Sequence, residues 1–587
     1  MAKKRKPQNK KLNGEWKIVI GILVITFLAF ANTLQNDFAY DDWFQIARNP
    51  QVTSWENIPK TFTQSVWQFM YETAREPTDL YYRPVFNSLL IVQYQLLGQK
   101  VWAWHLVSVL LHLLVVLLVY TLARNWEYEK TSAVIAALIF GLHPVHSEAV
   151  AWISSSPDLI AGIFVLASLV CYEWARDRKD GAQIRLRRSW ICASLLFALF
   201  AMFSKEQAVM LPLFIVAREL IDNLLIEVLI TGFSLQLFKK QAKACTQNLK
   251  HTSFFLIPAL IYLTARFFVM GFIVKSDERA AMITFGQMLL TIPGAIFSYT
   301  RMLFVPYPLA IVYDNDYVQS IGSMRFWLPF VGVIVIVGLT LWIIKNSSVA
   351  IRSFLFLVLF LMPVLNLRFF NQNESPIHDR YLYLPSIGFC FLVALALTKL
   401  FDKKVLFAVT ASISIIFFTL TFFQNRTWRD DVTLFTHALK FAPNKPFLHN
   451  TLAGAYSEIN QYNEAEKAYL KALELNPNYL ASYDGLGVIY TKQGRHEEAV
   501  KAFQKSTESN EPTALAYFNL GSSYINLKKF DEAEKALLKA IEINPSYSPA
   551  HYNLGWLYQQ RGQKELSIKH YGLAVELQQK ESQKQKQ

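Results

Sequence analysis

Two adjacent carboxylates, Asp41 and Asp42, lie in NDFAYDDWFQIARNP, a few residues after the first long apolar segment. Neighbouring carboxylates repel each other and are costly to desolvate beside a bilayer, so the pair needs a physical reason. Asp41 could cap a short amphipathic helix with Trp43 at the membrane interface. Alternatively, one of the two carboxylates could act as a base in a site. A cap needs only one Asp, and this stretch alone leaves both interpretations open.

Three single cations stand near the ends of apolar segments. Arg83 lies in YYRPVF, Lys205 in SKEQ and Arg380 in IHDRYLYLPS. Arg83 could simply snorkel to lipid headgroups, and Lys205 could pair with its neighbour Glu206 at a tight turn. If the three cations face one pocket, however, they place more positive charge there than membrane topology requires. The planar fork of Arg also suits a phosphate group.

The stretch HPVHSEAV adds His143, His146 and Glu148, and Asp158 follows in the next apolar segment. Histidines three residues apart could ligate a metal, but no third ligand stands at helical spacing and Pro144 breaks the local helix. We therefore assign no metal ligand, and a divalent ion as cofactor remains an open alternative. Glu148 and Asp158 are better suited to hydrogen-bond sugar hydroxyls or to orient a base. The other candidates for the pocket lining are Glu206, His378, Asp379 and Tyr381.

An acid, several cations and apolar walls together suit the transfer of a sugar from a polyprenyl phosphate. The isoprenoid tail would lie in the bilayer, and the cations would neutralise the departing phosphate. A carboxylate would take the proton from an acceptor hydroxyl as that hydroxyl attacks the anomeric carbon. Because a phosphate leaving group needs no general acid, one base suffices and inversion at the carbon is expected.

Membrane helices must position these residues. The chain of 587 residues is 53% apolar, above the globular norm of roughly 45–50%, and the excess lies before about Gln424. A span needs about 20 apolar residues, and twelve segments qualify approximately. They are residues 17–34, 101–123, 131–150, 157–175, 189–203, 206–224, 251–273, 283–304, 326–344, 350–367, 381–400 and 404–424.

Positive charge fixes the expected topology. The formal net charge of +14 is concentrated in the N-terminus (residues 1–16) and in connections that the positive-inside tendency places in the cytoplasm, so no nucleic-acid partner is predicted. The basic connection at residues 402–404 would not lie in the cytoplasm if all twelve segments crossed the membrane. Residues 282–304, interrupted by Pro293, are our choice for a re-entrant or interfacial segment, which leaves about eleven crossings. The first outer loop (residues 35–100) and the other candidates then share the outer face with the C-terminal domain.

The C-terminal part repeats with a constant offset of 34 residues. Leu452, Leu486, Leu520 and Leu554 superpose, as do the tyrosines four residues after each of them. This period and pattern identify tetratricopeptide repeats. We place a half unit at residues 428–442 and full repeats at about 443–476, 477–510, 511–544 and 545–578. Asn519 and Asn553 occupy equivalent positions on the first helices and could contact a peptide backbone in the concave groove.

The predicted fold is therefore all-α. A polytopic membrane domain (residues 17–424) precedes an α-solenoid of repeats (residues 425–587).

The ordered motifs resemble a known family. FAYDDWFQIARNP, YYRPV, GLHPVHSEAVAWISSSPDLIA, SKEQAVMLP and DRYLYLPSIGF, followed by the repeats, are similar to the transmembrane and tetratricopeptide repeat-containing O-mannosyltransferases that modify cadherins, and to their prokaryotic relatives. These enzymes have the glycosyltransferase C fold. The resemblance implies that Asp41 or Asp42 is the base and that Arg83, Lys205 and Arg380 contact the donor phosphate. It also implies that His146 and Glu148 line the pocket.

By the same resemblance, the donor is a dolichyl phosphate mannose and the acceptor is a Ser or Thr of a protein bound by the repeats. The compact loops suggest a bacterial chain, in which an undecaprenyl phosphate sugar would replace dolichol. The expected location is a bacterial plasma membrane, or the endoplasmic reticulum membrane in a eukaryote, with the repeats on the extracytoplasmic side and membrane lipid around the helices.

Two other functions compete with this one. A ligase could transfer an assembled lipid-linked glycan to protein or lipid, but such ligases usually carry a large late outer loop, and the loop at residues 366–381 is small. A non-catalytic membrane anchor could instead present the repeats as a scaffold. Such an anchor would not need so many charges at the edges of its membrane helices.

Overall fold

The structure is a computed structural model. It describes residues 15–70, 81–177, 185–186, 188–221, 252–272, 284–314, 317–344, 347–365, 377–508 and 512–586. The predictions for the basic N-terminus, for most of the basic connections at 176–188 and 238–250, and for the first part of the loop at 366–381 lie outside these residues.

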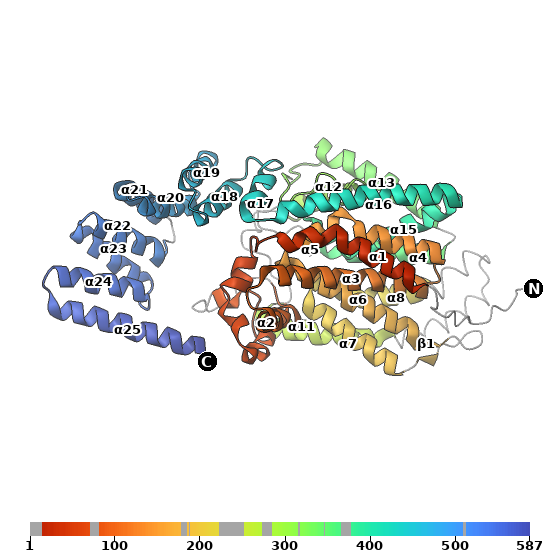
Figure 1. The fold of residues 1–587 in the computed structure, drawn as a ribbon, viewed down its shortest axis with the longest axis horizontal. Coiled ribbons are helices and arrows are strands. Elements are labelled where there is room, and N and C mark those ends of the chain that lie inside the picture. Colours follow the sequence, from red (N-terminus) through yellow and green to blue (C-terminus); the bar gives the residue numbers. More distant parts are fainter. Residues whose placement is uncertain are drawn as a thin grey trace, which may run out of the picture. The chain divides into compact units, whose positions relative to one another are not determined.

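The chain forms two compact units, Met1–Asp430 and Asp431–Gln587. The boundary lies a few residues after the one expected from composition. In the first unit, long helices run side by side, and short turns connect them (Figure 1). The helices of this unit are α1 (Trp16–Phe30), α2 (Pro84–Leu97), α3 (Val101–Asn125), α4 (Lys130–Leu142), α5 (Ser147–Ala151), α6 (Ser156–Ala175), α7 (Arg188–Ser204), α8 (Leu211–Leu220), α11 (Leu256–Met270), α12 (Phe285–Phe304), α13 (Met324–Ile344), α14 (Ser348–Leu361), α15 (Pro385–Leu400) and α16 (Lys403–Asn425).

Two very short strands, β1 (Arg176–Asp177) and β2 (Arg185–Leu186), pair antiparallel. All other regular structure in the described part of the chain is helical. The predicted all-α class with an array of repeats is thus confirmed.

Within the described residues, seven helices are long and apolar enough to cross a membrane. An eighth span results if the bent pair Lys130–Leu142 and Pro144–Ala151 counts as one. The helices Arg188–Ser204 and Pro385–Leu400 are apolar but shorter. The seven candidates are Trp16–Gln35, Val101–Asn125, Ile153–Ala175, Ser253–Met270, Met324–Trp342, Ser348–Leu365 and Lys403–Trp428.

Residues 282–304, our choice for a re-entrant or interfacial segment, contain the helix α12, which is not among the seven candidate spans. Pro293 leaves α12 unbroken, and the helix starts with a capping box formed by Thr284 and Gln287. A sharp bend that the sequence analysis did not predict occurs after α4, where the chain turns by 49°. There His143 has extended backbone and Pro144 begins a new turn, because proline cannot continue the ladder of the preceding helix. This bend carries the HPVHSEAV motif.

Close helix contacts in the first unit depend on small residues, as in other membrane bundles. Gly141 of α4 lies against Thr26 of α1. Gly388 of α15 lies against the backbone of α14, where an added Cβ would come within 2.4 Å of the Ser353 carbonyl oxygen. This contact fixes the start of α15, which directly follows the DRYLYLPS motif.

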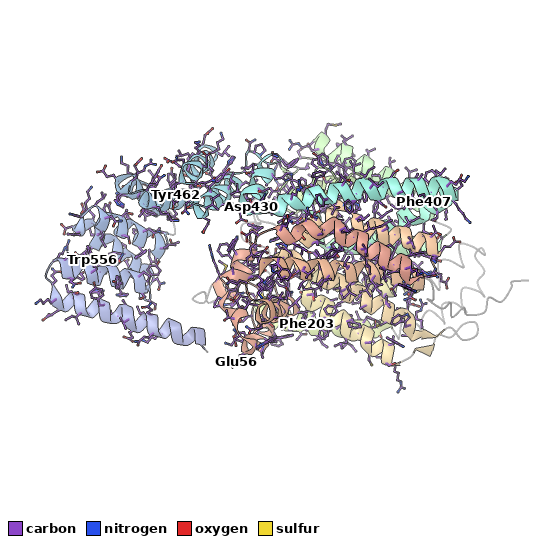
Figure 2. All side chains as sticks on the ribbon, in the orientation of Figure 1. Glu56, Phe203, Phe407, Asp430, Tyr462 and Trp556 are labelled. Atoms are coloured by element: carbon purple, nitrogen blue, oxygen red, sulfur yellow. The ribbon has the colours of Figure 1, made fainter. Side chains whose placement is uncertain are left out.

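The polar stretches gather at one end of this unit. Figure 1 shows α2 and α5 at the end opposite the start of α1. In Figure 2, Glu56 and Asp430 lie at that same end, whereas Phe407, near the start of α16, lies at the other. Residues far apart in the sequence can therefore form one site there.

The second unit consists of helix pairs. Its helices are α17 (Asp431–Leu439), α18 (Pro446–Glu458), α19 (Tyr462–Leu475), α20 (Leu480–Lys492), α21 (His496–Thr507), α22 (Ala514–Asn526), α23 (Phe530–Ile543), α24 (Ser548–Gln560) and α25 (Lys564–Lys586). The offset of 34 also appears in the backbone, because the turn inside each pair has a residue with positive φ. These residues are Asn460, Gly494, Lys528 and Gly562.

Candidate active site

The second carboxylate of the pair is tied to a distant loop. Asp42 is fully buried, and its Oδ1 accepts hydrogen bonds from the backbone N–H (2.7 Å) and the hydroxyl (2.5 Å) of Ser154. Its Oδ2 accepts from the N–H of Ala39 at 3.3 Å. Asp42 precedes the helical turn η2 (Trp43–Ala47), but its side chain makes no capping bond there. Burial raises the pKa of Asp42 to about 7, although the hydrogen bonds from Ser154 lower it.

Asp41 has a different environment, because it is only half-buried. The residue before it, Tyr40, has φ of 57°, a conformation that is strained for a bulky side chain. The ring of Tyr40 packs against Trp152 at a centroid distance of 5.6 Å. The strained residue and this contact fix the backbone that carries Asp41.

Arg380 pairs with Glu148. Arg380 lies on the turn η15 (Asp379–Leu382), and its guanidinium forms an ion pair with Glu148 of α5. The backbone N–H of Arg380 also donates to the other carboxylate oxygen of Glu148 at 2.9 Å. The guanidinium lies over the rings of Trp152 (5.1 Å) and Tyr381 (5.0 Å). Two aromatic faces and one carboxylate therefore orient this cation.

Lys205 pairs with Asp158 rather than with its neighbour. The ammonium group forms a buried ion pair with Asp158 in the first turn of α6, and it lies 5.3 Å from the ring centre of Tyr381. Burial lowers the pKa of Lys205, and the carboxylate of Asp158 partly offsets this. The ion pair between Lys205 and Glu206, one alternative from the sequence, is not formed.

Glu206 instead binds Arg83 across the fold. Nε and Nη2 of Arg83 donate to the carboxylate at 2.9–3.2 Å. Arg266 of α11 approaches the same carboxylate at 3.9 Å. Arg83 exposes 16% of its side chain and Glu206 exposes 31%, so this is the most open of the three pairs.

The structure thus brings the three predicted cations into one region, each beside a carboxylate. Lys205 and Arg380 share the ring of Tyr381, and Arg83 binds the residue next to Lys205. Such an array can hold a phosphate, because a guanidinium has more donors than one carboxylate uses.

The histidines are integrated into the helix packing. His143 donates from Nε2 to the carbonyl of Leu303 at 3.0 Å, and His146 shares a hydrogen bond of 2.9 Å with the hydroxyl of Ser386. No group of three or more His, Cys, Asp or Glu side chains that could hold a metal ion occurs among the residues placed by the structure.

His378 and Asp379 lie beside the Arg380 pair. Nδ1 of His378 is 3.4 Å from the guanidinium, and Asp379 accepts a hydrogen bond of 2.6 Å from the hydroxyl of Tyr313. Burial, together with the neighbouring Glu148, raises the pKa of Asp379 well above its usual range.

Sequence reasoning missed Trp152, Tyr313 and Arg266, which contact the site from other elements. Trp152 stands in the quoted motif AVAWISSSPD and Tyr313 in a polar loop, so both carried a weak signal. Arg266 lies inside an apolar helix, and an intramembrane arginine would have been the clearest signal of the three.

An apolar cavity of about 330 Å³ lies beside the bend of the HPVHSEAV motif. It is formed by α4, the end of α12, α15 and α16. The ring of His143 packs on Phe417, which lines the cavity, at 4.7 Å. Other lining residues are Ile139, Leu303, Tyr307, Phe389, Ile413 and Leu420.

In the repeat unit, Asn553 is half-buried, and its amide donates to the hydroxyl of Ser522 on the preceding first helix at 2.9 Å. Asn519 is also half-buried. Part of the hydrogen-bonding capacity of Asn553 is thus used between neighbouring repeats.

Comparisons with known proteins agree with this architecture. The model of the family "Dolichyl-phosphate-mannose-protein mannosyltransferase" matches residues 82–238, and tetratricopeptide repeat models match 448–511, 514–547 and 536–569. The matched mannosyltransferase region contains Arg83, Glu148, Asp158, Lys205 and Glu206.

The relatives that match most of this chain are named protein O-mannosyl-transferases. The protein O-mannosyl-transferase F38B6.6 of Caenorhabditis elegans is 26% identical over 80% of this chain and 64% of its own. The protein O-mannosyl-transferase TMTC3 of Homo sapiens is 23% identical over 78% of this chain and 51% of its own. The crystal structure of MamA matches 26% of this chain and 89% of its own, at 26% identity and a TM-score of 0.25.

The chain spans between about half and two thirds of the length of these two mannosyltransferase relatives. The resemblance predicted from the ordered motifs is confirmed, and the region of similarity covers both the membrane helices and the repeats.

Proposed function

We propose that this chain transfers a mannosyl or similar hexosyl group from a polyprenyl phosphate to Ser or Thr hydroxyls of a protein. The observation that carries the proposal is the cluster of Arg83, Lys205 and Arg380. These cations lie at the same end of the first unit as the Asp41–Asp42 pair. The match of residues 82–238 to a dolichyl-phosphate-mannose-protein mannosyltransferase model supports it.

Asp41 is the base in this proposal. Asp42 is fully buried and accepts three hydrogen bonds, so it anchors the loop. Asp41 is half-buried and follows the strained Tyr40. Its carboxylate takes the proton from the acceptor hydroxyl while the hydroxyl oxygen forms a bond to the anomeric carbon.

As that bond forms, the bond between the anomeric carbon and the phosphate oxygen breaks, and the electron pair leaves with the polyprenyl phosphate. Arg83 and Arg380 stabilise the growing negative charge with the donors that Glu206 and Glu148 leave available. Lys205, buried against Asp158, adds positive potential behind them. The reaction inverts the configuration at the anomeric carbon.

The lipid and the protein acceptor use different parts of the chain. The apolar cavity between α4, α12, α15 and α16 suits part of an isoprenoid tail, because its lining is almost entirely aliphatic and aromatic. The repeats are expected to hold the acceptor polypeptide, as concave α-solenoid surfaces commonly do.

The test is transfer of labelled mannose from polyprenyl phosphate mannose to Ser/Thr-containing protein by the purified full chain in nanodiscs. A parallel reaction offers a pyrophosphate-linked oligosaccharide lipid, the donor that a ligase would use. We expect label from the monophosphate donor only. Transfer from the oligosaccharide lipid alone would replace this proposal with the ligase, and transfer from neither would favour the scaffold.

A further inference from the structure

Several buried polar atoms concentrate in one short stretch, His146–Ser156. In the described part of the chain, the hydroxyls of Ser147 and Ser156 and the indole N–H of Trp152 have no hydrogen-bond partner. All three side chains are at least 95% buried. A buried donor without an acceptor destabilises the fold, so a cluster of them in one stretch needs an explanation.

The same stretch connects the charged groups of the site. Ser154 holds Asp42, and Glu148 holds Arg380. The ring of Trp152 contacts the ring of Tyr40 and the Arg380 guanidinium, and it stacks on Trp428 at 5.5 Å with an interplanar angle of 14°. The indole therefore contacts both the residue before the proposed base and one proposed phosphate contact.

The chemistry of these groups suits a sugar rather than a phosphate. An indole N–H is a donor only, and a serine hydroxyl both donates and accepts, as the hydroxyls of a hexose require. None of these groups adds charge, whereas the phosphate already has three cations.

We propose that His146–Ser156 recognises the transferred sugar, with the indole N–H of Trp152 and the hydroxyls of Ser147 and Ser156 binding hexose hydroxyls. This inference rests on the proposed function, since it names the part of the donor that each group contacts. Trp152 is the central contact, because its ring touches both Tyr40 and Arg380.

The test measures equilibrium binding of two lipids to the full chain in nanodiscs, independent of turnover. One lipid is polyprenyl phosphate mannose, and the other is sugar-free polyprenyl phosphate. Trp152→Phe keeps an aromatic ring but removes the N–H. We expect it to weaken binding of the mannose lipid about tenfold, as loss of one buried hydrogen bond does, and to leave binding of the sugar-free lipid unchanged.

Ser147→Ala provides a second, smaller change with the same expected pattern if Trp152→Phe does not fold. Trp126→Phe is the matched control. The indole of Trp126 donates to Glu173 at 2.9 Å, so this variant should lose thermal stability without changing the affinity for either lipid.

Equal weakening for both lipids would place Trp152 at the phosphate and overturn the assignment. Unchanged affinities in both variants, or a wild-type chain that binds the two lipids equally well, would also overturn it. Failure of the proposed function is distinguishable, because it would appear as lipid binding by the wild type without transfer of label.

Discussion

Both hydrogen-bond donors of Ser154, its backbone N–H at 2.7 Å and its hydroxyl at 2.5 Å, converge on a single carboxylate oxygen of Asp42. This contact joins two segments that are 112 residues apart in the sequence. It ties the loop of the acidic pair to the stretch that presents Glu148 and Asp158. In the proposed function the two adjacent aspartates have separate tasks, Asp42 holding the loop and Asp41 acting as the base.

Replacing each aspartate separately by asparagine tests this division of roles between Asp41 and Asp42. Asp41→Asn should lower kcat of sugar transfer by roughly 10²–10⁴-fold, because it removes the proposed base, and should leave thermal stability unchanged. Asp42→Asn should mainly lower stability, since an amide N–H₂ would face the N–H of Ala39. The measurements are kcat and the apparent melting temperature of both variants. A larger loss of kcat in Asp42→Asn than in Asp41→Asn would reverse the assignment.

The stability of the membrane unit should depend on pH through Asp42. Burial raises the pKa of Asp42 from 3.8 to about 7. The folded state therefore binds the proton more tightly than the unfolded state, and this contribution to stability is lost as pH rises from about 4 to about 7. We expect the apparent melting temperature to fall between pH 5 and pH 8. In Asp42→Asn, the slope over this range should be clearly smaller, and an equal slope would exclude Asp42 as its source.

Much of the fold could be predicted because its signals are local. The offset of 34 residues specified the repeats, and apolar segments of sufficient length specified most membrane helices. The bend after α4 could not be predicted this way. Pro293 leaves α12 continuous, whereas Pro144 begins a new turn after His143, which has extended backbone.

The candidate residues could be found from their types, but their partners could not. Lys205 and Glu206 are neighbours in sequence, yet each pairs with a residue of another element, Asp158 and Arg83. Such pairs depend on how helices pack, which residue spacing does not encode. Trp152 is uncharged, so a search for charged residues could not select it, and the role that we propose for it follows from its contacts in the structure.

Removing one partner of the Lys205–Asp158 pair should be much worse than removing both. Lys205→Met leaves the Asp158 carboxylate buried without its cation, at a cost of about 3–5 kcal/mol. Lys205→Met with Asp158→Leu should recover most of the folded protein but no transfer activity, because the cation is still missing. The folded fraction is measured by size-exclusion chromatography of detergent extracts.

The exposed pair of Lys471 and Glu474 is the control, since Lys471→Met should cost less than about 1 kcal/mol. A double variant whose loss of stability equals the sum of the losses in Lys205→Met and Asp158→Leu would mean that the two residues act independently. Full activity in the double variant would remove Lys205 from the phosphate site.

The contact between α14 and α15 should not tolerate a single methyl group. A Cβ at Gly388 would lie 2.4 Å from the Ser353 carbonyl oxygen and 2.7 Å from the Leu357 amide nitrogen, and backbone atoms cannot move aside. Gly388→Ala should destabilise the unit by about 1–3 kcal/mol and lower its melting temperature. Gly338→Ala, where an added Cβ meets nothing within 4 Å, should be neutral. Equal melting temperatures for the two variants would contradict this close approach.

The repeat unit should gain stability from a glycine at one turn. Lys528 has φ of 57°, and the equivalent positions 34 residues away on either side are Gly494 and Gly562. A residue with a Cβ pays about 1–2 kcal/mol in this conformation, while glycine loses somewhat more chain entropy on folding. Lys528→Gly should therefore raise the free energy of unfolding of residues 431–587 by roughly 0.5–1 kcal/mol, measured by urea denaturation. Gly494→Ala should lower it by a similar amount, because alanine would take on the strain that lysine now carries. Lower stability of Lys528→Gly would mean that contacts of the lysine side chain outweigh the backbone strain.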